Sequence, residues 1–525
     1  MRRALLVRHG TVHDGLGTPG RIADVLVEDG RIVDVAPGIE NPDAEVIDAA
    51  GLLVAPGFID IHSHSDFTLL VDPRAVSSIA QGVTTEVIGN CGYGCAPIGD
   101  PALAREVIYG FRDQPELDWR DLAGYLDRLA AARPAVNVAA LVPNGQLRLA
   151  AVGLEDRAAT PDELAVMQRL LREGLEQGAF GYSTGLEYAT ETGASEAEVT
   201  SLCRTVAAAD GLYATHTRNR DEAAVAAVEE AVRTAETAGV RLQVSHIVPR
   251  GGREDVERAI ETVVRSQERG SGAAFDMHTR FFGTTYLKVL IPAWAFEGGR
   301  AELVRRLRSP EERSRMATPR NLITALGDWS KVVLLDNPGL PEFSRRDFRT
   351  IGEMKGMSPL DAAFDLLLAE IEQLHRPMVI LHCYTEDLLK LAYEHRNCSV
   401  GSDATALAPD GPLASSTFHG AYSWAAWFWR RIVRESGMLS PEEGVRRMTS
   451  LAAARVGLKG RGVLQPGAAA DIIVFDNAAF GETATTFEPN QLAKGMRHVV
   501  VNGVPSLHDG KLLPARSGAV LRKVD

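Results

Sequence analysis

Cysteine is scarce in this sequence, and its distribution excludes a disulfide framework. The 525 residues contain five cysteines, an odd number, scattered from Cys91 to Cys398. Disulfide-stabilised secreted domains instead carry paired cysteines at short spacings. We therefore expect reduced thiols and a cytoplasmic location.

The chain also lacks a long apolar run. A membrane-spanning helix needs about 20 consecutive apolar residues, and no stretch of this length occurs. The first ten residues hold only a short apolar run, which is too little for a signal peptide. The sequence predicts neither a membrane span nor an export signal.

An excess of positive charge is absent as well. The formal net charge is -13 at pH 7, which argues against non-specific binding to nucleic acid or to anionic membranes. No internal repeat or low-complexity tract is present, and the composition is that of a soluble globular protein. We expect an enzyme whose partner is a small-molecule substrate, with no nucleic acid and no membrane; the oligomeric state stays unassigned.

The two ends of the chain share one pattern of short strands and tight turns. Apolar segments at 4–7, 23–27 and 31–35 precede residue 55, and similar segments at 471–475, 499–501 and 511–513 follow residue 460. Residues 28–30 (EDG) form a hairpin signal. We predict a small β-sandwich domain built jointly from residues 1–55 and 461–525.

Between these ends, residues 56–460 alternate apolar strands with Ala-, Glu- and Arg-rich helical segments such as 161–174, 221–238 and 254–269. This alternation predicts a parallel sheet, and about eight units predict a closed (β/α)₈ barrel of the TIM type within the α/β class. The stretch 283–360 breaks the rhythm and is predicted to be an insertion. Nine strand candidates are counted, so one of them is not a barrel strand: 58–64, 83–88, 136–142, 180–183, 212–216, 242–246, 273–277, 378–382 and 399–403.

The histidine pair His62 and His64 stands at the end of the first of these strands. Side chains alternate faces along a strand, so both imidazoles are expected on one side. An isolated His-x-His is more often a surface pair than a metal site. Here the preceding segment is too apolar for a surface strand, which favours the metal site.

Further metal-binding side chains follow the other predicted strands. Cys91 comes after 83–88, His216 and His246 end the strands at 212–216 and 242–246, and Asp403 ends the last. A barrel gathers the carboxyl ends of its strands around its active site. Imidazole and thiolate donors with one carboxylate favour zinc over magnesium or calcium.

Taken together, these segments resemble the amidohydrolase superfamily, and more closely its N-acyl-D-amino-acid deacylase branch. The resemblance covers nearly the whole chain and includes 57–66 (GFIDIHSHSD), 82–92 (GVTTEVIGNCG), 181–188 (GYSTGLEY), 215–218 (THTR), 244–246 (VSH), 401–403 (GSD), 408–411 (APDG), 471–475 (DIIVF) and 501–503 (VNG).

The resemblance implies how the metal would be held. Cys91, with His216 and His246, would bind one tight zinc, and His62, His64 and Asp403 would line a second, weaker position. The alternative role for Cys91 is that of a small buried hydrophobe, but its setting between Asn90 and Gly92 at a strand end favours the ligand role. Zinc would lower the pKa of a bound water to about 7 and polarise an amide carbonyl. Asp403 is expected to take the water proton and return it to the leaving amine.

The residues expected to contact the substrate differ from those of the deacylase branch. In that branch a lysine usually stands two residues after the histidine of the sixth strand, and here this position is Val248. The branch also has a Tyr-Pro-Tyr motif after the seventh strand, where this chain has the residues around His278. Arg280 is our candidate to bind the substrate carboxylate, since guanidinium binds carboxylates bidentately. The other substrate-binding candidates are Tyr188, Arg148 and Arg218, although an arginine near a strand end is more often a solvated or ion-paired residue.

The predicted function is zinc-dependent hydrolysis of an exocyclic amide, with an N-acyl-D-amino acid or a related N-acylated metabolite as substrate. A cyclic amidase of the hydantoinase or dihydroorotase kind is the alternative, and Cys91 together with 183–186 (STGL) favours the deacylase. A non-catalytic barrel scaffold would show eroded ligands, and none is eroded here.

Overall fold

A parallel barrel forms the centre of the molecule. The computed structural model describes residues 4–110, 115–318 and 321–523. Eight parallel strands follow one another around the barrel in chain order, and backbone hydrogen bonds from Asp403 N to His62 O (2.8 Å) and from His64 N to Ala404 O (2.7 Å) close the ring. The strands are β6 (Phe58–Asp60), β7 (Val83–Ile88), β8 (Asn137–Pro143), β9 (Gly181–Gly185), β10 (Leu212–His216), β11 (Arg241–Val244), β12 (Ala274–Met277) and β16 (Cys398–Val400).

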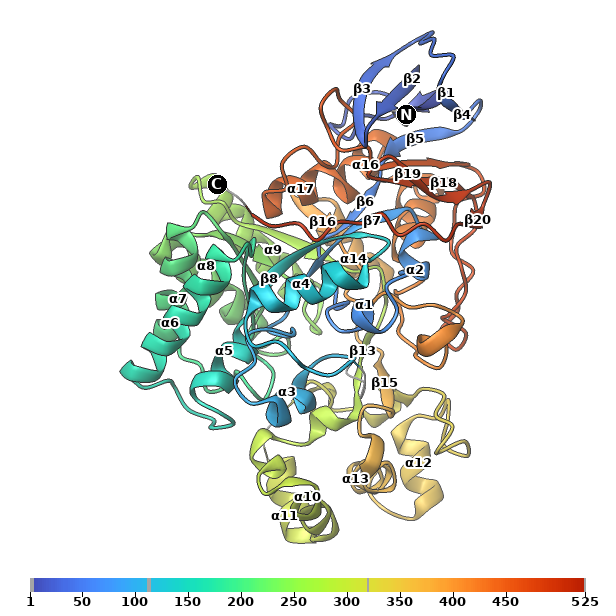
Figure 1. Ribbon diagram of the computed structural model, residues 1–525. Coiled ribbons are helices and arrows are strands. Elements are labelled where there is room, and N and C mark those ends of the chain that lie inside the picture. Colours follow the sequence, from blue (N-terminus) through green and yellow to red (C-terminus); the bar gives the residue numbers. More distant parts are fainter. Residues whose placement is uncertain (1–3, 111–114, 319–320, 524–525) are drawn as a thin grey trace.

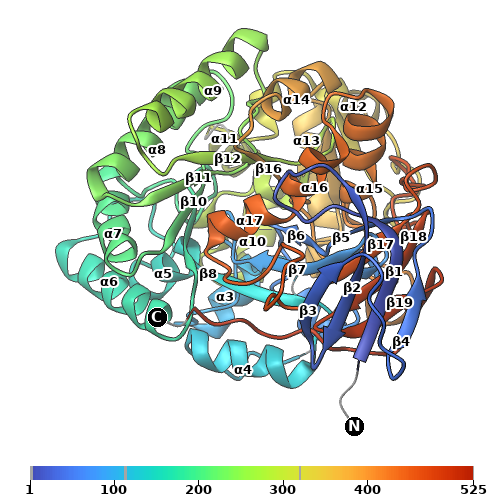
Figure 2. The same ribbon diagram turned by 90° about the horizontal axis from the view of Figure 1, so that it is seen from above.

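Helices surround the barrel strands, as Figure 2 shows for α6 to α9. Thr160 and Glu163 form a capping box at the start of α6, and Pro161 occupies its first turn, so local sequence defines where this helix begins. The helices outside the insertion are α1 (Thr68–Val71), α2 (Val76–Ile79), α3 (Pro101–Val107), α4 (Leu122–Ala132), α5 (Asn144–Ala151), α6 (Pro161–Glu176), α7 (Glu196–Ala208), α8 (Ala224–Ala238), α9 (Arg253–Glu268), α14 (Glu386–Tyr393), α15 (Trp424–Phe428), α16 (Pro441–Met448) and α17 (Ser450–Val456).

Apolar side chains fill the barrel and seal its amino-terminal end. Ile59, Val87 and Leu141 point into one buried cluster, which Ala452 and Val456 of α17 complete. The barrel interior is therefore a packed core and not a pore. Only the carboxyl ends of the strands remain available to build a polar site.

Both termini contribute to a second sheet of nine strands, confirming the small β domain expected from the sequence. β5 pairs with β1 from the N-terminal part and with β17 from the C-terminal part. The strands are β1 (Ala4–Val12), β2 (Arg21–Glu28), β3 (Arg31–Ala36), β4 (Glu45–Asp48), β5 (Leu53–Pro56), β17 (Ile472–Phe475), β18 (Met496–Val501), β19 (Val504–His508) and β20 (Lys511–Leu512).

A third unit lies at the opposite end of the barrel from the terminal sheet (Figure 1). Its sheet has the order β13-β15-β14, with both pairs antiparallel, and its helices enclose a separate apolar core. The elements are β13 (Gly283–Tyr286), α10 (Gly299–Arg308), α11 (Pro310–Ala317), β14 (Val332–Leu334), α12 (Phe348–Lys355), α13 (Pro359–Ala369) and β15 (Met378–Leu381).

The strand candidate at 378–382 therefore does not belong to the barrel. β15 pairs with β13 and β14, whereas β12 pairs directly with β16. An apolar run of five residues does not indicate which sheet the strand joins, because the pattern of apolar residues indicates that a strand is buried but not which strand it pairs with. None of the helices within the described ranges is long and apolar enough to cross a membrane.

Candidate metal centre

Six side chains from five strand ends converge at the carboxyl end of the barrel. His62 Nε2 lies 3.1 Å from Cys91 Sγ, and Cys91 Sγ lies 3.5 Å from His246 Nε2. His216 Nδ1 is 3.1 Å from His246 Nε2. His64 Nε2 is 3.2 Å from Asp403 Oδ1. The structure thus brings together all six residues that the sequence nominated.

Cys91 belongs to two groups of possible ligands. One consists of Cys91, His216 and His246, and the other of His62, His64, Cys91 and Asp403; within each group the ligand atoms lie within 4.8 Å of one another. All of these residues are buried except Asp403, which is partly exposed. A buried set of imidazole nitrogens and one thiolate sulfur fits zinc, and the carboxylate adds a harder ligand to the second position.

Three of the six residues have a left-handed backbone conformation. The φ angle is +53° at Cys91, +36° at His246 and +44° at Asp403. Residues other than glycine adopt this region at an energetic cost, and such residues concentrate at functional sites. Each lies two or three residues beyond its strand, because β7 ends at Ile88, β11 at Val244 and β16 at Val400. The predicted strands 242–246 and 399–403 were too long, whereas 83–88 was correct, and the turn that follows each strand aims the side chain.

The first barrel strand is also shorter than the predicted 58–64. β6 ends at Asp60, and Ser63 forms an isolated parallel bridge to Ala404 between the two histidines. Asp60 accepts hydrogen bonds from the backbone N–H groups of His62 (3.2 Å) and Ser402 (2.9 Å). This buried carboxyl therefore ties the first ligand-bearing loop to the last.

Two further carboxylates orient the histidines, and sequence reasoning missed both. Asp276 Oδ1 lies 3.3 Å from His62 Nδ1 and accepts a hydrogen bond from the backbone of His246 at 2.8 Å. Glu187 Oε2 lies 2.7 Å from His216 Nε2. A carboxylate on the second nitrogen of a ligating histidine fixes its tautomer and ring orientation. The position of Asp276 at a barrel strand end was the available signal.

The ionisation of Cys91 and of His246 suits ligation. Burial alone would raise the pKa of the Cys91 thiol, but His62, His216 and His246 hold this pKa well below its ordinary value. Burial, reinforced by the positive charge of Arg220, lowers the pKa of His246 to about 4. A thiolate and a neutral imidazole are the forms that bind metal.

Arg280 lies in the site, but its donors are already used. Its Nη2 donates to Asp403 Oδ2 (2.7 Å) and its Nη1 to the carbonyls of Ser402 (2.6 Å) and His419 (2.8 Å). Its Nε is enclosed without a partner. Arg280 therefore holds Asp403 and the loop around it, and has no terminal donor left for a substrate carboxylate.

Arg148 and Arg218 are not brought into the cluster. Arg148 is buried against Glu198, with Nη1 and Oε1 2.5 Å apart, and donates to backbone carbonyls. Arg218 forms a forked ion pair with Glu230. Both guanidinium groups brace loops outside the metal centre, which is the more common role of such residues.

Tyr188 does lie at the cluster, within a group of aromatic side chains that we name the aromatic wall. The Tyr188 hydroxyl is 3.2 Å from His216 Nδ1, and its ring centroid is 4.7 Å from that of Tyr93. Ring contacts extend from His64 through Tyr109 at 5.1 Å. The aromatic wall consists of Tyr93, Tyr109, Tyr188, Tyr286 and Phe418.

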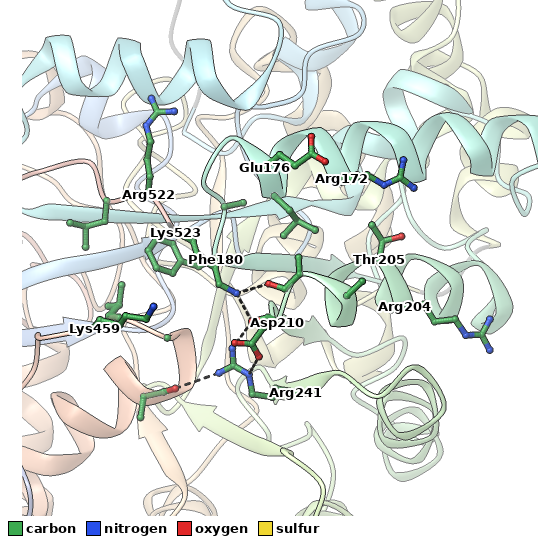
Figure 3. A pocket seen from close by; sticks show the side chains of 18 of the residues that line it. Arg172, Glu176, Phe180, Arg204, Thr205, Asp210, Arg241, Lys459, Arg522 and Lys523 are labelled. Carbon is green, nitrogen blue, oxygen red and sulfur yellow. Dashed lines mark hydrogen bonds and ion pairs between the residues drawn. The ribbon is translucent and has the colours of Figure 1, made fainter. Parts of the chain in front are cut away.

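A large cavity of about 1190 Å³ lies at the other end of the barrel and takes no part in this chemistry. Phe180, Asp210 and Arg241, which line it, precede or begin strands β9, β10 and β11 (Figure 3). Arg241 donates to the carbonyls of Asp210 and Arg455, so its charge serves the packing of chain segments. Contacts at the amino-terminal face of a barrel serve stability.

Comparison with known proteins identifies relatives along the whole chain. The profile of the Amidohydrolase family matches residues 45–303 and 353–506. A D-aminoacylase of Alcaligenes xylosoxydans xylosoxydans is 32% identical over 523 residues, covering 99% of this chain and 97% of that protein. An N-acyl-D-aspartate deacylase of the same organism is 34% identical over 526 residues, covering 99% and 95%.

Solved structures give the same result. The crystal structure of an N-acyl-D-glutamate deacylase from Bordetella bronchiseptica, complexed with zinc and a phosphonate inhibitor that mimics the tetrahedral intermediate, superposes with a TM-score of 0.80. It is 30% identical in sequence and covers 100% of both chains. The similarity therefore extends across the barrel, the terminal sheet and the insertion together.

Proposed function

Because this chain belongs to the amidohydrolase family, we propose that it is a zinc-dependent hydrolase that removes the acyl group from N-acyl-D-amino acids. The observation that carries the proposal is the buried group of Cys91, His216 and His246, with a second group sharing Cys91. The full-length likeness to three D-amino-acid deacylases supports the substrate class.

Cys91, His216 and His246 would hold the tight zinc, and His62, His64 and Asp403 would complete the weaker position. Bound zinc would activate a water molecule and polarise the amide carbonyl of the substrate. Glu187 orients the His216 ring for this task through the 2.7 Å contact with Nε2.

Asp403 would move the proton. Its carboxylate is partly open to the site, with 22% of the side chain exposed, while Arg280 holds Oδ2 in place. The other oxygen faces His64. A carboxylate fixed in this way can accept the proton of the attacking water and deliver it to the amine that leaves.

The aromatic wall would receive the apolar part of the substrate. Its rings line the side of the centre next to His64 and His216, and aromatic faces bind acyl chains and aromatic groups through dispersion and hydrophobic contact. We expect a neutral acyl group in preference to a charged one on this side.

A metal analysis combined with a substrate panel tests the proposal. Purified protein should contain at least one zinc per chain by mass spectrometry, and should hydrolyse N-acetyl-D-leucine about 100-fold faster than N-acetyl-L-leucine at equal concentration. Hydantoin, dihydroorotate and a simple lactam are the controls. Hydrolysis of a cyclic control in place of the N-acetyl compounds would assign a cyclic amidase and overturn the proposal.

A further inference from the structure

Arg220 is a buried arginine in the loop after β10. Only 7% of the residue is exposed. Its Nη2 donates to the backbone carbonyls of His246 and Val248, each at 2.7 Å. The guanidinium group is therefore held against the loop that carries one of the zinc ligands.

This guanidinium has no carboxylate within ion-pair distance among the described residues, unlike three other buried arginines. Arg148 pairs with Glu198, Arg280 with Asp403, and Arg447 with Glu443. Among the residues that the structure describes, Arg220 hydrogen-bonds only to the two carbonyls. Glu187 attracts this charge and Arg250 repels it from beyond ion-pair distance. A buried charge with no direct ion-pair partner is costly, and a bound carboxylate would supply that partner.

The remaining donors of Arg220 have no hydrogen-bond partner within the described residues. Nε and Nη1 make no hydrogen bond within the described chain, yet neither is among the fully enclosed polar atoms without a partner, unlike the Nε of Arg280. These donors are therefore unpaired and not completely enclosed. Because Nη2 is committed to the backbone, the group is also preorganised, and little side-chain entropy would be lost on binding.

The surroundings connect Arg220 to the metal centre. Its guanidinium carbon lies 5.9 Å from the centroid of the Tyr384 ring. Tyr384 stands edge-on to His278 at 5.3 Å, and His278 lies 6.4 Å from His246. Arg220 thus borders the wall formed by Tyr384 and His278, whereas the aromatic wall contacts His64 and His216.

We propose that Arg220 binds the α-carboxylate of the N-acyl-D-amino acid. The inference rests on the proposed deacylase function and deepens it by assigning the cation that recognises the amino-acid half. The α-carboxylate is two bonds from the scissile nitrogen, so its receptor must lie beside the ligands, and Arg220 is hydrogen-bonded to the backbone of His246 itself. The three arginines nominated from sequence already have carboxylate partners.

The first test uses the wild-type zinc enzyme and three compounds. N-acetyl-D-leucine carries the α-carboxylate, N-acetyl-D-leucinamide carries none, and N-acetyl-D-isoglutamine carries only a side-chain carboxylate. We expect kcat/KM for the first to exceed that for the other two by about 100-fold, the range of a charged hydrogen bond in a buried site.

The outcomes distinguish a failure of the Arg220 assignment from a failure of the proposed deacylase function. Hydrolysis of the leucine acid and its amide at equal rates would overturn the role of Arg220 and leave the deacylase standing. Equal rates for N-acetyl-D-isoglutamine and N-acetyl-D-leucine would show that a side-chain carboxylate can replace the α-carboxylate. This result would also overturn the role of Arg220. Hydrolysis of none of the three compounds would overturn both proposals.

The second test changes the residue. Arg220→Gln should lower kcat/KM for N-acetyl-D-leucine about 100-fold, chiefly through KM, while altering that for the amide less than about 3-fold and leaving zinc content unchanged. Arg220→Lys should recover part of the loss. Arg233→Gln, an exposed arginine on α8 paired with Glu196, is the matched control and should behave as wild type. Equal losses for acid and amide, or lost zinc, would make Arg220 structural and overturn the assignment.

Discussion

Cys91 is the one residue shared by both groups of ligand atoms, so its replacement distinguishes a zinc ligand from a buried thiol. Cys91→Ala should lose the tightly held zinc, which mass spectrometry of the dialysed protein would detect, because His216 and His246 alone make a weak site. Cys203→Ala is the control, since that thiol is buried in α7 away from the cluster. Full zinc content in Cys91→Ala would remove Cys91 from the ligand set.

Replacement of Asp403 tests its proposed role in proton transfer. Asp403→Asn keeps the size of the side chain but cannot accept a proton, so we expect kcat to fall by about 10²- to 10⁴-fold. Zinc bound by Cys91, His216 and His246 should remain. Asp410→Asn, an exposed carboxylate on the same segment, should retain wild-type turnover. An Asp403→Asn enzyme with most of its activity would exclude the shuttle.

At the level of elements, the contact between β9 and the loop after β7 sets the position of Cys91. A Cβ on Gly185 would lie 2.0 Å from the carbonyl oxygen of Cys91 and 2.6 Å from the Tyr188 ring. Gly185→Ala should therefore displace this loop, lower the free energy of unfolding by about 1–3 kcal/mol and reduce zinc occupancy. Gly252→Ala, where a Cβ would meet nothing within 4 Å, is the control. Unchanged stability and zinc in Gly185→Ala would contradict this account.

Element boundaries were less accurate than element identities. Val83–Ile88 and Leu212–His216 match their predicted bounds, whereas β6, β11 and β16 end before the ligands that follow them. Apolar periodicity marks the buried part of a strand, but the left-handed residues Cys91, His246 and Asp403 carry no sequence signal for their conformation. The turns that aim these ligands depend on closure of the barrel.

At the scale of the whole molecule, the metal centre joins the ends of five strands that are distant in sequence. Removing zinc with a chelator should lower Tm by about 5 °C, as expected for a ligand present at about 1000-fold its Kd acting on a core of about 400 residues. Differential scanning calorimetry before and after chelation measures the change, and added zinc should restore it. An unchanged Tm would mean that the folded state binds zinc no better than the unfolded chain.

The order of strands and helices, the pairing of the two termini in one sheet, and the six candidate ligands followed from sequence alone. Each of these features depends on local sequence patterns: the periodicity of apolar residues, the residues typical of turns, and polar side chains at the ends of apolar strands. Which strand candidate left the barrel, which carboxylates orient the histidines, and which arginines are already paired were decided only by the tertiary structure. Partner choice among charged groups depends on distances between segments that are 12 to 123 positions apart for these arginines. Arg280 and Asp403, 123 positions apart, meet only when the barrel closes and the ends of β12 and β16 lie side by side.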